Sequence, residues 1–497
     1  MKRSLTRILL SVSILISFTA AGFTPSAVSA QSGGLYYVVQ QDDSLYSISQ
    51  SFHTSTARLQ QVNDISDPDM MDPGTRLLIP GFGTLSGTLT SVKIAVGDTP
   101  HTLLRSTRSD ASTFNRINFL TSEDTPVVGQ KLFLLASSDT ATTRIPVTDG
   151  GLTGLELAAQ NNVNPWTAAE FNSLSGPWYL IPNDTLFLPA SATNSSNEIL
   201  PGISDITVSS LGQGKTAVIT AKTTGSSQLS STLNFTIVDT DKEEQNYAAA
   251  LNTPTAIPTP SITLFNYENH ALNFFTQTDG SLEALQGVPR MTVPGFASLI
   301  MTAKTKDGKS YSIQQNVKVK KVDYGYDYNM QVADNFVDPK VTEPEQAFLL
   351  KTVLPASNDK LFDGAFKSPT STPDCTTDTY GKLRAFNGSD YIYWHSGIDY
   401  CGANGGKIFA VADGTVVYTG ELTVRGNATI IDHGHGVYTA YYHQSKIEVT
   451  NGQKVKAGDE IGLIGATGRV TGPHLHLDVI VGDVQVDPTE WLKGLYP

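Results

Sequence analysis

Hydrophobic and polar positions in the first two hundred residues repeat with a period of about 55 residues. In the first copy, an apolar run at 37–39 predicts a strand, and amphipathic runs at 44–52 and 56–62 predict two helices, before a closing strand at 77–80. Three landmarks keep the period: Asn63, Asn118 and Asn172; the turns at 42–44, 97–99 and 151–153; and Gly74-x-x-Leu77, Gly129-x-x-Leu132 and Asn183-x-x-Leu186. The sequence therefore predicts three βααβ units, at 35–81, 91–137 and 144–190.

A different pattern, the strict alternation of hydrophobic and polar positions, marks residues 204–322. Three runs predict half-buried strands: 217–220, 233–237 and 261–265. Asp307-Gly308 separates two more such runs, at 299–305 and 311–319, and this dipeptide is typical of a two-residue hairpin turn. We expect an immunoglobulin-like β-sandwich. It contains no catalytic constellation, so we expect it to act as a rigid spacer.

Length and composition support several domains. At 497 residues the chain is too long for one hydrophobic core. Its 39% hydrophobic and 16% charged residues are typical of folded soluble protein, and a net charge of -13 disfavours nucleic acid as a partner. A helix predicted at 342–353, with Pro344 in its first turn, leads into a last domain at 340–497. The expected fold class is multidomain and mainly β.

The first thirty residues have the pattern of a secretory signal. Lys2, Arg3 and Arg7 precede an apolar run at 8–23, and Val28-Ser-Ala30 provides small residues for cleavage after residue 30. An uncleaved membrane anchor is the alternative, but the run is short for a span and contains serines. No later segment approaches membrane length. We therefore predict a mature chain without a transmembrane segment, secreted or held in the cell envelope outside the cytoplasmic membrane.

Cys375 and Cys401 are the only cysteines, and both lie in the last domain. In an exported protein, an even number favours one disulfide, worth about 3 kcal/mol in the loop-entropy model. The alternative is that Cys401, two residues beyond Asp399, binds a metal. That role would leave Cys375 unpaired in an oxidising compartment.

Histidines are concentrated near the C-terminus, where six of the nine occur, at 395, 433, 435, 443, 474 and 476. His395-Ser-Gly-Ile-Asp399 offers an imidazole and a carboxylate four positions apart, which share a face in an extended chain or a helical turn. His474-Leu-His476 lies in a run whose apolar residues alternate, so both imidazoles project from one face of a strand. Two imidazoles and a carboxylate around zinc leave a fourth position for water, as a hydrolase requires.

His443, at the end of a predicted strand at 437–443, completes the set. The chain contains no H-E-x-x-H, so the glutamate base of that metallopeptidase class is missing and a histidine must move the proton. His433-Gly-His435 is a second H-x-H pair, but it lies between two predicted strands, and we interpret it as a hairpin turn. His53, His101 and His270 stand alone and are predicted to be ordinary surface or packing residues.

Between about residues 381 and 492, the chain resembles the lysostaphin- and LytM-type zinc endopeptidases of bacterial cell walls. The motifs are His395-x-Gly-x-Asp399, Ile431-Asp-His-Gly-x-Gly436, Tyr441-x-His443 and Gly465-x-Thr-Gly468-x-x-Thr-Gly-Pro-His474-x-His476. The resemblance implies that His395, Asp399 and His476 bind Zn²⁺ and that His443 and His474 are catalytic. It also implies a mostly antiparallel β-sheet.

The first repeat, with D-S-L-Y-S-I near its start and P-G-T-R-L-L-I-P at its end, resembles the LysM module. LysM modules bind N-acetylglucosamine-containing glycans, so peptidoglycan, both peptide and glycan, is the implied partner. The second repeat has Pro100 where leucine is usual, and the third lacks the aspartate of the turn. A spacer role for the third is as well supported as glycan binding.

These observations favour a secreted, monomeric zinc endopeptidase that cuts peptidoglycan stem peptides or cross-bridges. One alternative is a non-catalytic, envelope-binding regulator of other wall hydrolases; such proteins lack zinc ligands, and all three are present here. Another is a secreted peptidase of glycine-rich proteins that the LysM-like units merely tether.

Overall fold

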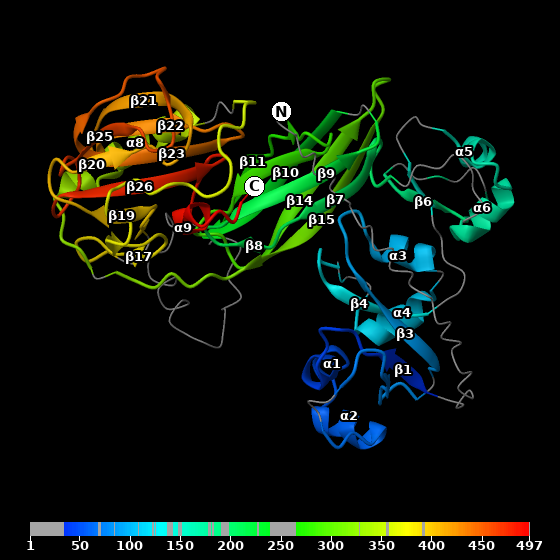
Figure 1. Cartoon of the computed structure of the whole chain (residues 1–497). Helices are drawn as coiled ribbons and strands as arrows, with labels where there is room; N and C mark the ends of the chain where they lie inside the picture. The colour runs from blue at the N-terminus through cyan, green and yellow to red at the C-terminus, as the bar shows by residue number, and fades with distance from the viewer. Residues whose placement is uncertain are drawn as a thin grey trace, which may run out of the picture. The chain divides into compact units, whose positions relative to one another are not determined.

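We describe a computed structural model of the chain, which forms two compact units, residues 1–88 and 89–497 (Figure 1). The structure describes residues 34–67, 71–83, 85–107, 109–121, 124, 126–136, 143–147, 152–176, 180, 183–189, 198–225, 228–238, 265–327, 329–353, 357–389 and 393–496. The predicted signal peptide lies outside these residues. Within them, no helix has both the length and the hydropathy to cross a bilayer.

The first unit contains the predicted βααβ arrangement. Its elements are β1 (Leu35–Val38), α1 (Leu45–Ser51), α2 (Thr56–Asn63) and β2 (Arg76–Leu78). Strands β1 and β2 pair antiparallel. Helix α1 begins where the Ser44 hydroxyl accepts from the Ser47 backbone amide and Ser47 returns the bond, which satisfies two free amides of the first turn. The buried faces of these elements form a small apolar core from Leu45, Ile48, Leu59 and Leu77.

Two further segments have the same element order. One contains β3 (Gly87–Lys93), α3 (Pro100–Thr107), α4 (Ala111–Asn118) and β4 (Lys131–Leu135). The other contains β5 (Thr143–Pro146), α5 (Gly154–Gln160), α6 (Pro165–Phe171) and β6 (Thr185–Leu188). Each has its own small hydrophobic core.

One asparagine closes each of the three segments in the same way. The Asn63 side-chain amide donates to the carbonyls of Leu59 (2.9 Å) and Leu78 (3.0 Å), and its oxygen accepts from the Leu78 amide (2.6 Å). The same three bonds recur at two later asparagines: Asn118 with Phe114 and Phe133, and Asn172 with Ala168 and Phe187. The period of the sequence thus corresponds to a repeated tie between the second helix and the closing strand.

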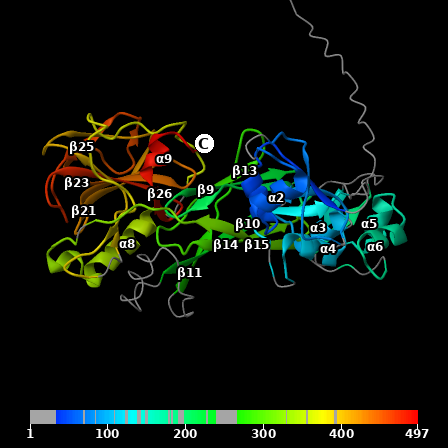
Figure 2. The same ribbon diagram turned by 90° about the horizontal axis from the view of Figure 1, so that it is seen from below.

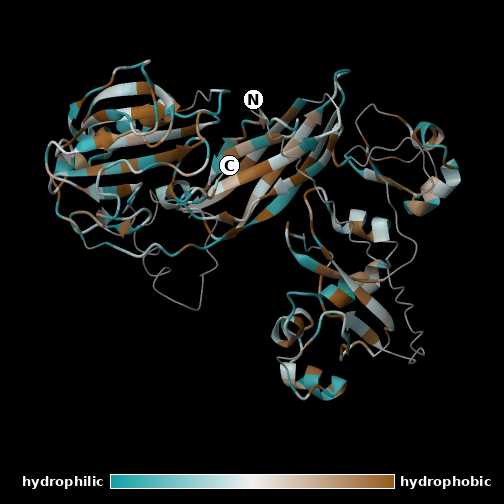
Figure 3. Cartoon of the chain, in the orientation of Figure 1, coloured by the Kyte–Doolittle hydropathy of each residue, from teal (hydrophilic) through white to brown (hydrophobic). Residues whose placement is uncertain are grey.

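The described residues between 203 and 320 form two sheets that share one hydrophobic core. One sheet has the order β11 (Phe265–Ala271), β10 (Gln228–Val238), β14 (Gly295–Lys304), β15 (Ser310–Lys320) and β8 (Leu211–Gly212). The other has the order β12 (Phe275–Thr276), β13 (Leu282–Gly287), β9 (Thr216–Thr223) and β7 (Ile203–Val208). Apolar and polar residues alternate along these strands, as the sequence predicts (Figure 3).

Hairpin β14–β15 turns at the predicted dipeptide. Gly308 has φ +89°, a conformation that favours glycine, and the Thr305 amide donates to the Lys309 carbonyl (2.8 Å). Of the strand predicted at 261–265, only residue 265 lies among the described residues, at the start of β11.

The last domain is built on a ten-stranded sheet in which all pairings are antiparallel, with the order β16-β19-β26-β23-β22-β21-β24 and β20, β25 and β27 paired beside it. The main strands are β16 (Thr376–Asp378), β19 (Ile398–Cys401), β26 (His474–Val481), β23 (Val437–Ile447), β22 (Gly426–Asp432), β21 (Gly414–Leu422) and β24 (Lys454–Val455). The others are β20 (Lys407–Phe409), β25 (Glu460–Ile464), β27 (Val484–Val486) and the separate pair β17 (Leu383–Arg384) and β18 (Tyr393–Trp394).

Helix α8 (Pro339–Val353) covers one face of this sheet, where Leu349 and Val353 pack on strands β22 and β23 (Figure 2). The prediction that the helix begins at residue 342 with Pro344 in its first turn is wrong. Asp338 accepts from the Lys340 amide (2.9 Å), so the helix begins at Pro339 and Pro344 lies inside it. The other face of the sheet carries the larger core, which includes Trp491 of α9 (Pro488–Leu492).

The two-sheet domain packs directly against the last domain. The Lys215 ammonium lies 2.8 Å from the Asp487 carboxylate, and the Trp491 indole donates to Thr216 (3.1 Å). At position 287, an added Cβ would lie 2.6 Å from Val484, so the glycine allows β13 to approach hairpin β26–β27. This hairpin begins with His474 and His476, and the contact therefore reaches the strand of the predicted site.

Candidate metal centre

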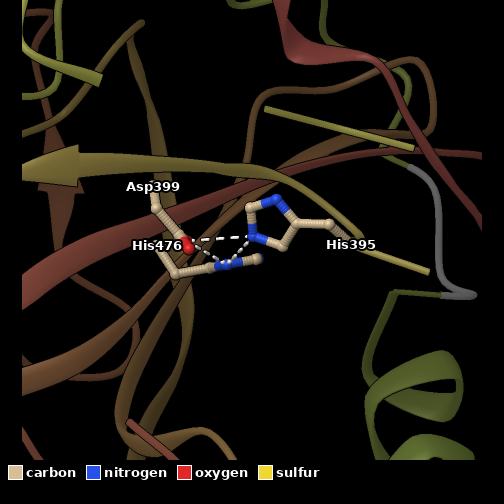
Figure 4. Close-up of side chains that lie close together, drawn as sticks. All are labelled: His395, Asp399 and His476. Carbon is tan, nitrogen blue, oxygen red and sulfur yellow. Dashed lines mark hydrogen bonds and ion pairs between the residues drawn. The ribbon is translucent and has the colours of Figure 1, made fainter. Parts of the chain in front are cut away.

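His395, Asp399 and His476 converge although they lie up to 81 residues apart (Figure 4). Strands β19 and β26 pair antiparallel with Asp399 opposite His476. The Asp399 Oδ1 lies 2.7 Å from His476 Nδ1 and 3.0 Å from His395 Nε2, and these two ring nitrogens are 3.0 Å apart. Two imidazole nitrogens and one carboxylate oxygen at a single point form the donor set that suits zinc and leaves room for water.

Gly397, between the two residues of the first motif, makes this convergence possible. A Cβ there would lie 2.1 Å from the Leu477 carbonyl oxygen and 2.7 Å from His476 Nε2. Any larger residue would push β19 away from β26. The glycine of H-x-G-x-D is therefore required by the close approach of the two strands.

Hydrogen bonds on the far side of each ring decide which nitrogen faces the centre. His395 Nδ1 donates to the Thr379 carbonyl (2.8 Å), which leaves Nε2 toward the centre. His476 Nε2 donates to the Asp478 carboxylate (2.6 Å), which leaves Nδ1 toward it. Such outer partners fix ring orientation and raise ligand basicity.

Charges within the cluster are strongly coupled. Burial alone would raise the pKa of Asp399, but His395 and His476 outweigh it and hold that pKa well below its usual value. Burial opposes protonation of His476, yet the carboxylates of Asp478 and Asp399 raise its pKa to about 9. The centre therefore attracts positive charge.

His443 and His474 form a second pair beside the first three residues, with ring centroids 4.8 Å apart. His443 Nδ1 lies 2.8 Å from the Thr467 carbonyl oxygen and His474 Nδ1 lies 2.9 Å from that of Gly472, so each ring donates from Nδ1 and keeps Nε2 for other partners. His474 Nε2 is 3.8 Å from Asp399 Oδ1. Burial and then the neighbouring His476 and His474 lower the pKa of His443 to about 3, so its ring is neutral at neutral pH.

The backbone of His443 departs from the predicted strand end. Strand β23 continues through His443 to Ile447, and the pairing of β22 with β23 shifts register close to this point. His443 has φ +62°, in the left-handed region, and its amide donates to the Arg425 carbonyl (3.0 Å). Strained backbone of this kind re-aims a side chain, here toward His474.

The other histidines of the domain lie outside the cluster. His433 and His435 occupy the turn between β22 and β23, as predicted. The His433 ring is fully buried between the Asp413 carbonyl and the Thr439 hydroxyl, each 2.7 Å away. His435 stacks on Phe275 at a centroid distance of 4.1 Å.

Cys375 and Cys401 form a disulfide with a Cα–Cα distance of 5.5 Å, so the Cys401 sulfur is not available as a metal ligand. Cys401 lies opposite His474 in the β19–β26 ladder. The bridge therefore ties the residue before the edge strand β16 to β19, the strand that carries Asp399.

Sequence reasoning missed Asp478, which is fully buried and also accepts from the Gln485 side-chain Nε2 (3.1 Å). The strand period contained the signal: Asp478 follows His474 and His476 at intervals of two and so shares their face. It also missed Asp378, whose carboxylate lies 3.6 Å from His395 Nδ1 and pairs with Lys382 and Arg384.

We expect Asp478→Asn to weaken zinc binding about 10-fold, because the His476 ring loses its charged partner. Competition with a chromophoric chelator measures the affinity. Asp374→Asn, at an exposed position of the same domain, is the matched control. Unchanged affinity in Asp478→Asn would contradict this role for the carboxylate.

Comparisons with known proteins agree with this geometry. Residues 393–488 match the model of peptidase family M23, and residues 37–80 match the LysM domain. Peptidoglycan DD-endopeptidase ShyA of Vibrio cholerae is 48% identical over 87 residues, 18% of this chain and 20% of that protein. DD-carboxypeptidase/endopeptidase Mpg of Neisseria meningitidis is 42% identical over 94 residues, 19% of this chain and 22% of that protein.

The chain thus matches about a fifth of the length of these curated relatives. Among solved structures, the catalytic domain of the antimicrobial peptidase lysostaphin from Staphylococcus simulans is 29% identical. The alignment covers 27% of this chain and 93% of that chain, with a TM-score of 0.20.

Proposed function

Because residues 393–488 form a peptidase family M23 domain and residues 37–80 a LysM domain, we propose that this chain is a zinc-dependent endopeptidase of bacterial cell walls. Its substrate is the peptide part of peptidoglycan, in stem peptides or cross-bridges. One observation carries the proposal: His395 Nε2, Asp399 Oδ1 and His476 Nδ1 meet at one point, beside two imidazoles that keep Nε2 for other partners.

In this proposal His395, Asp399 and His476 hold the zinc ion. Bound zinc would polarise the scissile carbonyl and lower the pKa of a coordinated water to roughly 7. Nε2 of His443 or His474 accepts the proton from the attacking water, while the other ring stabilises the oxyanion and assists the leaving amine. Either ring of the pair can take either of these two roles.

A zymogram with purified cell walls, run with and without a chelator, tests this function. We expect the enzyme to clear the walls, the chelator to abolish this clearing, and added zinc to restore it. A folded, zinc-loaded chain that clears no wall and releases no peptide would favour the non-catalytic regulator instead. Mass spectrometry of released fragments, compared with those from a pentaglycine peptide, separates a wall peptidase from a peptidase of glycine-rich proteins.

LysM domains bind N-acetylglucosamine-containing glycan, so the first unit is proposed to tether the enzyme to peptidoglycan. Tethering raises the concentration of the hydrolase at an insoluble substrate. We expect deletion of residues 31–86 to lower the rate on intact walls by about tenfold or more. The rate on a soluble stem peptide serves as the control and should stay the same; equal losses on both substrates would contradict the tether.

We extend the proposal to the whole chain: a signal peptide at 1–30, LysM-like units at 35–81, 91–137 and 144–190, an immunoglobulin-like sandwich at 204–322, and a peptidase domain at 340–497 with its core at 381–492. The recurring asparagine bonds support the three units. The turn aspartates support glycan binding by the first two units. Asp43 accepts from the Gln40 amide and Asp98 from the Ala95 amide, whereas the third unit has Leu152 at this position. We propose that the protein acts as a monomer that is secreted or held in the cell envelope.

A further inference from the structure

Arg469 lies in the loop between β25 and β26 that also positions the two catalytic candidates. Thr467, two residues earlier, supplies the carbonyl that holds the His443 ring, and the loop ends at His474. The Arg469 amide donates to the Val424 carbonyl (2.8 Å), next to Arg425, whose carbonyl accepts from the His443 amide. The backbone of Arg469 is therefore fixed relative to the His443–His474 pair.

The Arg469 side chain crosses to the segment that precedes His395. Its guanidinium carbon lies 4.7 Å from the centroid of the Phe386 ring, and NH1 donates to the Phe336 carbonyl (2.9 Å). The Phe386 ring in turn packs against the ring of Tyr393, two residues before His395, with the ring centroids 5.1 Å apart. Arg469 thus connects the loop that precedes His476 with the segment that precedes His395.

Three arginines lie near one another here, and two of them are neutralised. Arg384 pairs with Asp327 (2.8 Å) and with Asp378, and Arg425 pairs with Glu345 (2.9 Å). Within the part of the chain that the structure describes, no carboxylate lies within ion-pair distance of Arg469. Asp327, Asp378 and Glu345 bind the other two guanidinium groups instead.

Arg469 nevertheless stays charged at neutral pH. Burial and then the charges of Arg384 and Arg425 lower its pKa to about 10, still well above 7. A partly buried cation without an anion is unfavourable, and an anion from outside would relieve it. The guanidinium presents parallel N–H donors that match a carboxylate, and among the described residues its one side-chain hydrogen bond, to Phe336, leaves other donors for a ligand.

We propose that Arg469 binds a free carboxylate of the substrate close to the scissile bond. The enzyme would then prefer wall peptides with a free carboxyl group over the same peptides with a carboxamide. This inference rests on the proposed function, because wall stem peptides carry such carboxyl groups. In this inference Arg469 determines substrate specificity and takes no part in zinc binding or proton transfer.

The test compares two stem-peptide dimers that differ only in one group beside the scissile bond, a carboxylate in one and a carboxamide in the other. For the full chain, kcat/KM should be about 10- to 100-fold higher for the carboxylate, mainly through KM, because one charge-assisted hydrogen-bond pair is lost in the carboxamide. Arg469→Gln should remove this preference by lowering only the carboxylate rate, with zinc affinity unchanged. Lys454→Gln, at an exposed position of the same domain, should keep it.

Arg469→Lys keeps the charge but loses the two-pronged donor, and we expect an intermediate preference. If Arg469→Gln folds poorly, the preference for carboxylate over carboxamide is measured in Arg469→Lys instead. Equal losses on both peptides in either variant would indicate a purely structural role and overturn the proposal. Equilibrium binding of the two peptides to the zinc-loaded chain gives a readout that does not need turnover: equal affinity overturns the inference, whereas missing hydrolysis with preferential binding overturns only the proposed function.

Discussion

Replacing His476 by alanine is expected to remove bound zinc and, with it, all measurable hydrolysis of cell walls. His476 supplies one of the three proposed ligand atoms, and its loss removes the imidazole that lies 2.7 Å from the Asp399 carboxylate, which has little solvent contact. We expect zinc affinity to fall on the order of 100-fold or more. Elemental analysis after dialysis and chelator competition measure the affinity, and a zymogram measures the activity.

His101→Ala provides the matched control, because His101 is exposed and lies outside the C-terminal domain. This variant should keep full zinc and full activity. Thermal unfolding of both variants separates loss of the ion from loss of the fold. A folded His476→Ala chain with undiminished zinc affinity would refute the coordination sphere proposed here.

The second large effect is expected in His443→Ala, which should bind zinc normally and turn over at least 100-fold more slowly. The His443 ring lies beside His474, and its Nδ1 is committed to Thr467, so the substitution removes an Nε2 group without removing a proposed ligand. Stopped assays with a soluble stem peptide, together with zinc analysis of the same sample, test both halves of the expectation.

His474→Ala should behave in the same way, because His474 holds the equivalent position on the other side of the pair. The informative comparison is between these two variants and His476→Ala. Loss of zinc from His443→Ala or His474→Ala would mean that ligands and proton carriers have been exchanged in the proposal. Full turnover in either would exclude that ring from the reaction.

The side-chain directions on each strand were predictable because their signals are local, whereas the grouping of His395, Asp399 and His476 was implied by the family resemblance. In an extended strand, alternate residues share a face, so His474-Leu-His476 already placed two imidazoles side by side. The repeat was also visible, because a period of about 55 residues requires only that each unit makes the same local contacts, such as those of Asn63 and Asn118. The same reasoning located the Asp307-Gly308 hairpin.

Where prediction failed, one deciding contact was a local helix cap and the other was pairing between separate strands. Helix α8 begins three residues before its predicted start because Asp338 caps it. Strand β23 runs past His443 because its pairing with β22 and β25 continues across a register shift. Neither strand pairing across a bulge nor the choice among competing caps is marked by a short pattern.

The amino-acid sequence by itself indicated which residues are candidate metal ligands, which residues share a face of each strand and the period of the first two hundred residues, because these depend on spacing within one segment. Only the tertiary structure decided which ring nitrogens face the centre, that Asp478 supports His476, and that Arg469 is left without an acidic partner among the described residues. Those outcomes depend on which side chains from strands and loops up to 133 residues apart compete for the same groups. Such competition is settled only when the sheet has formed.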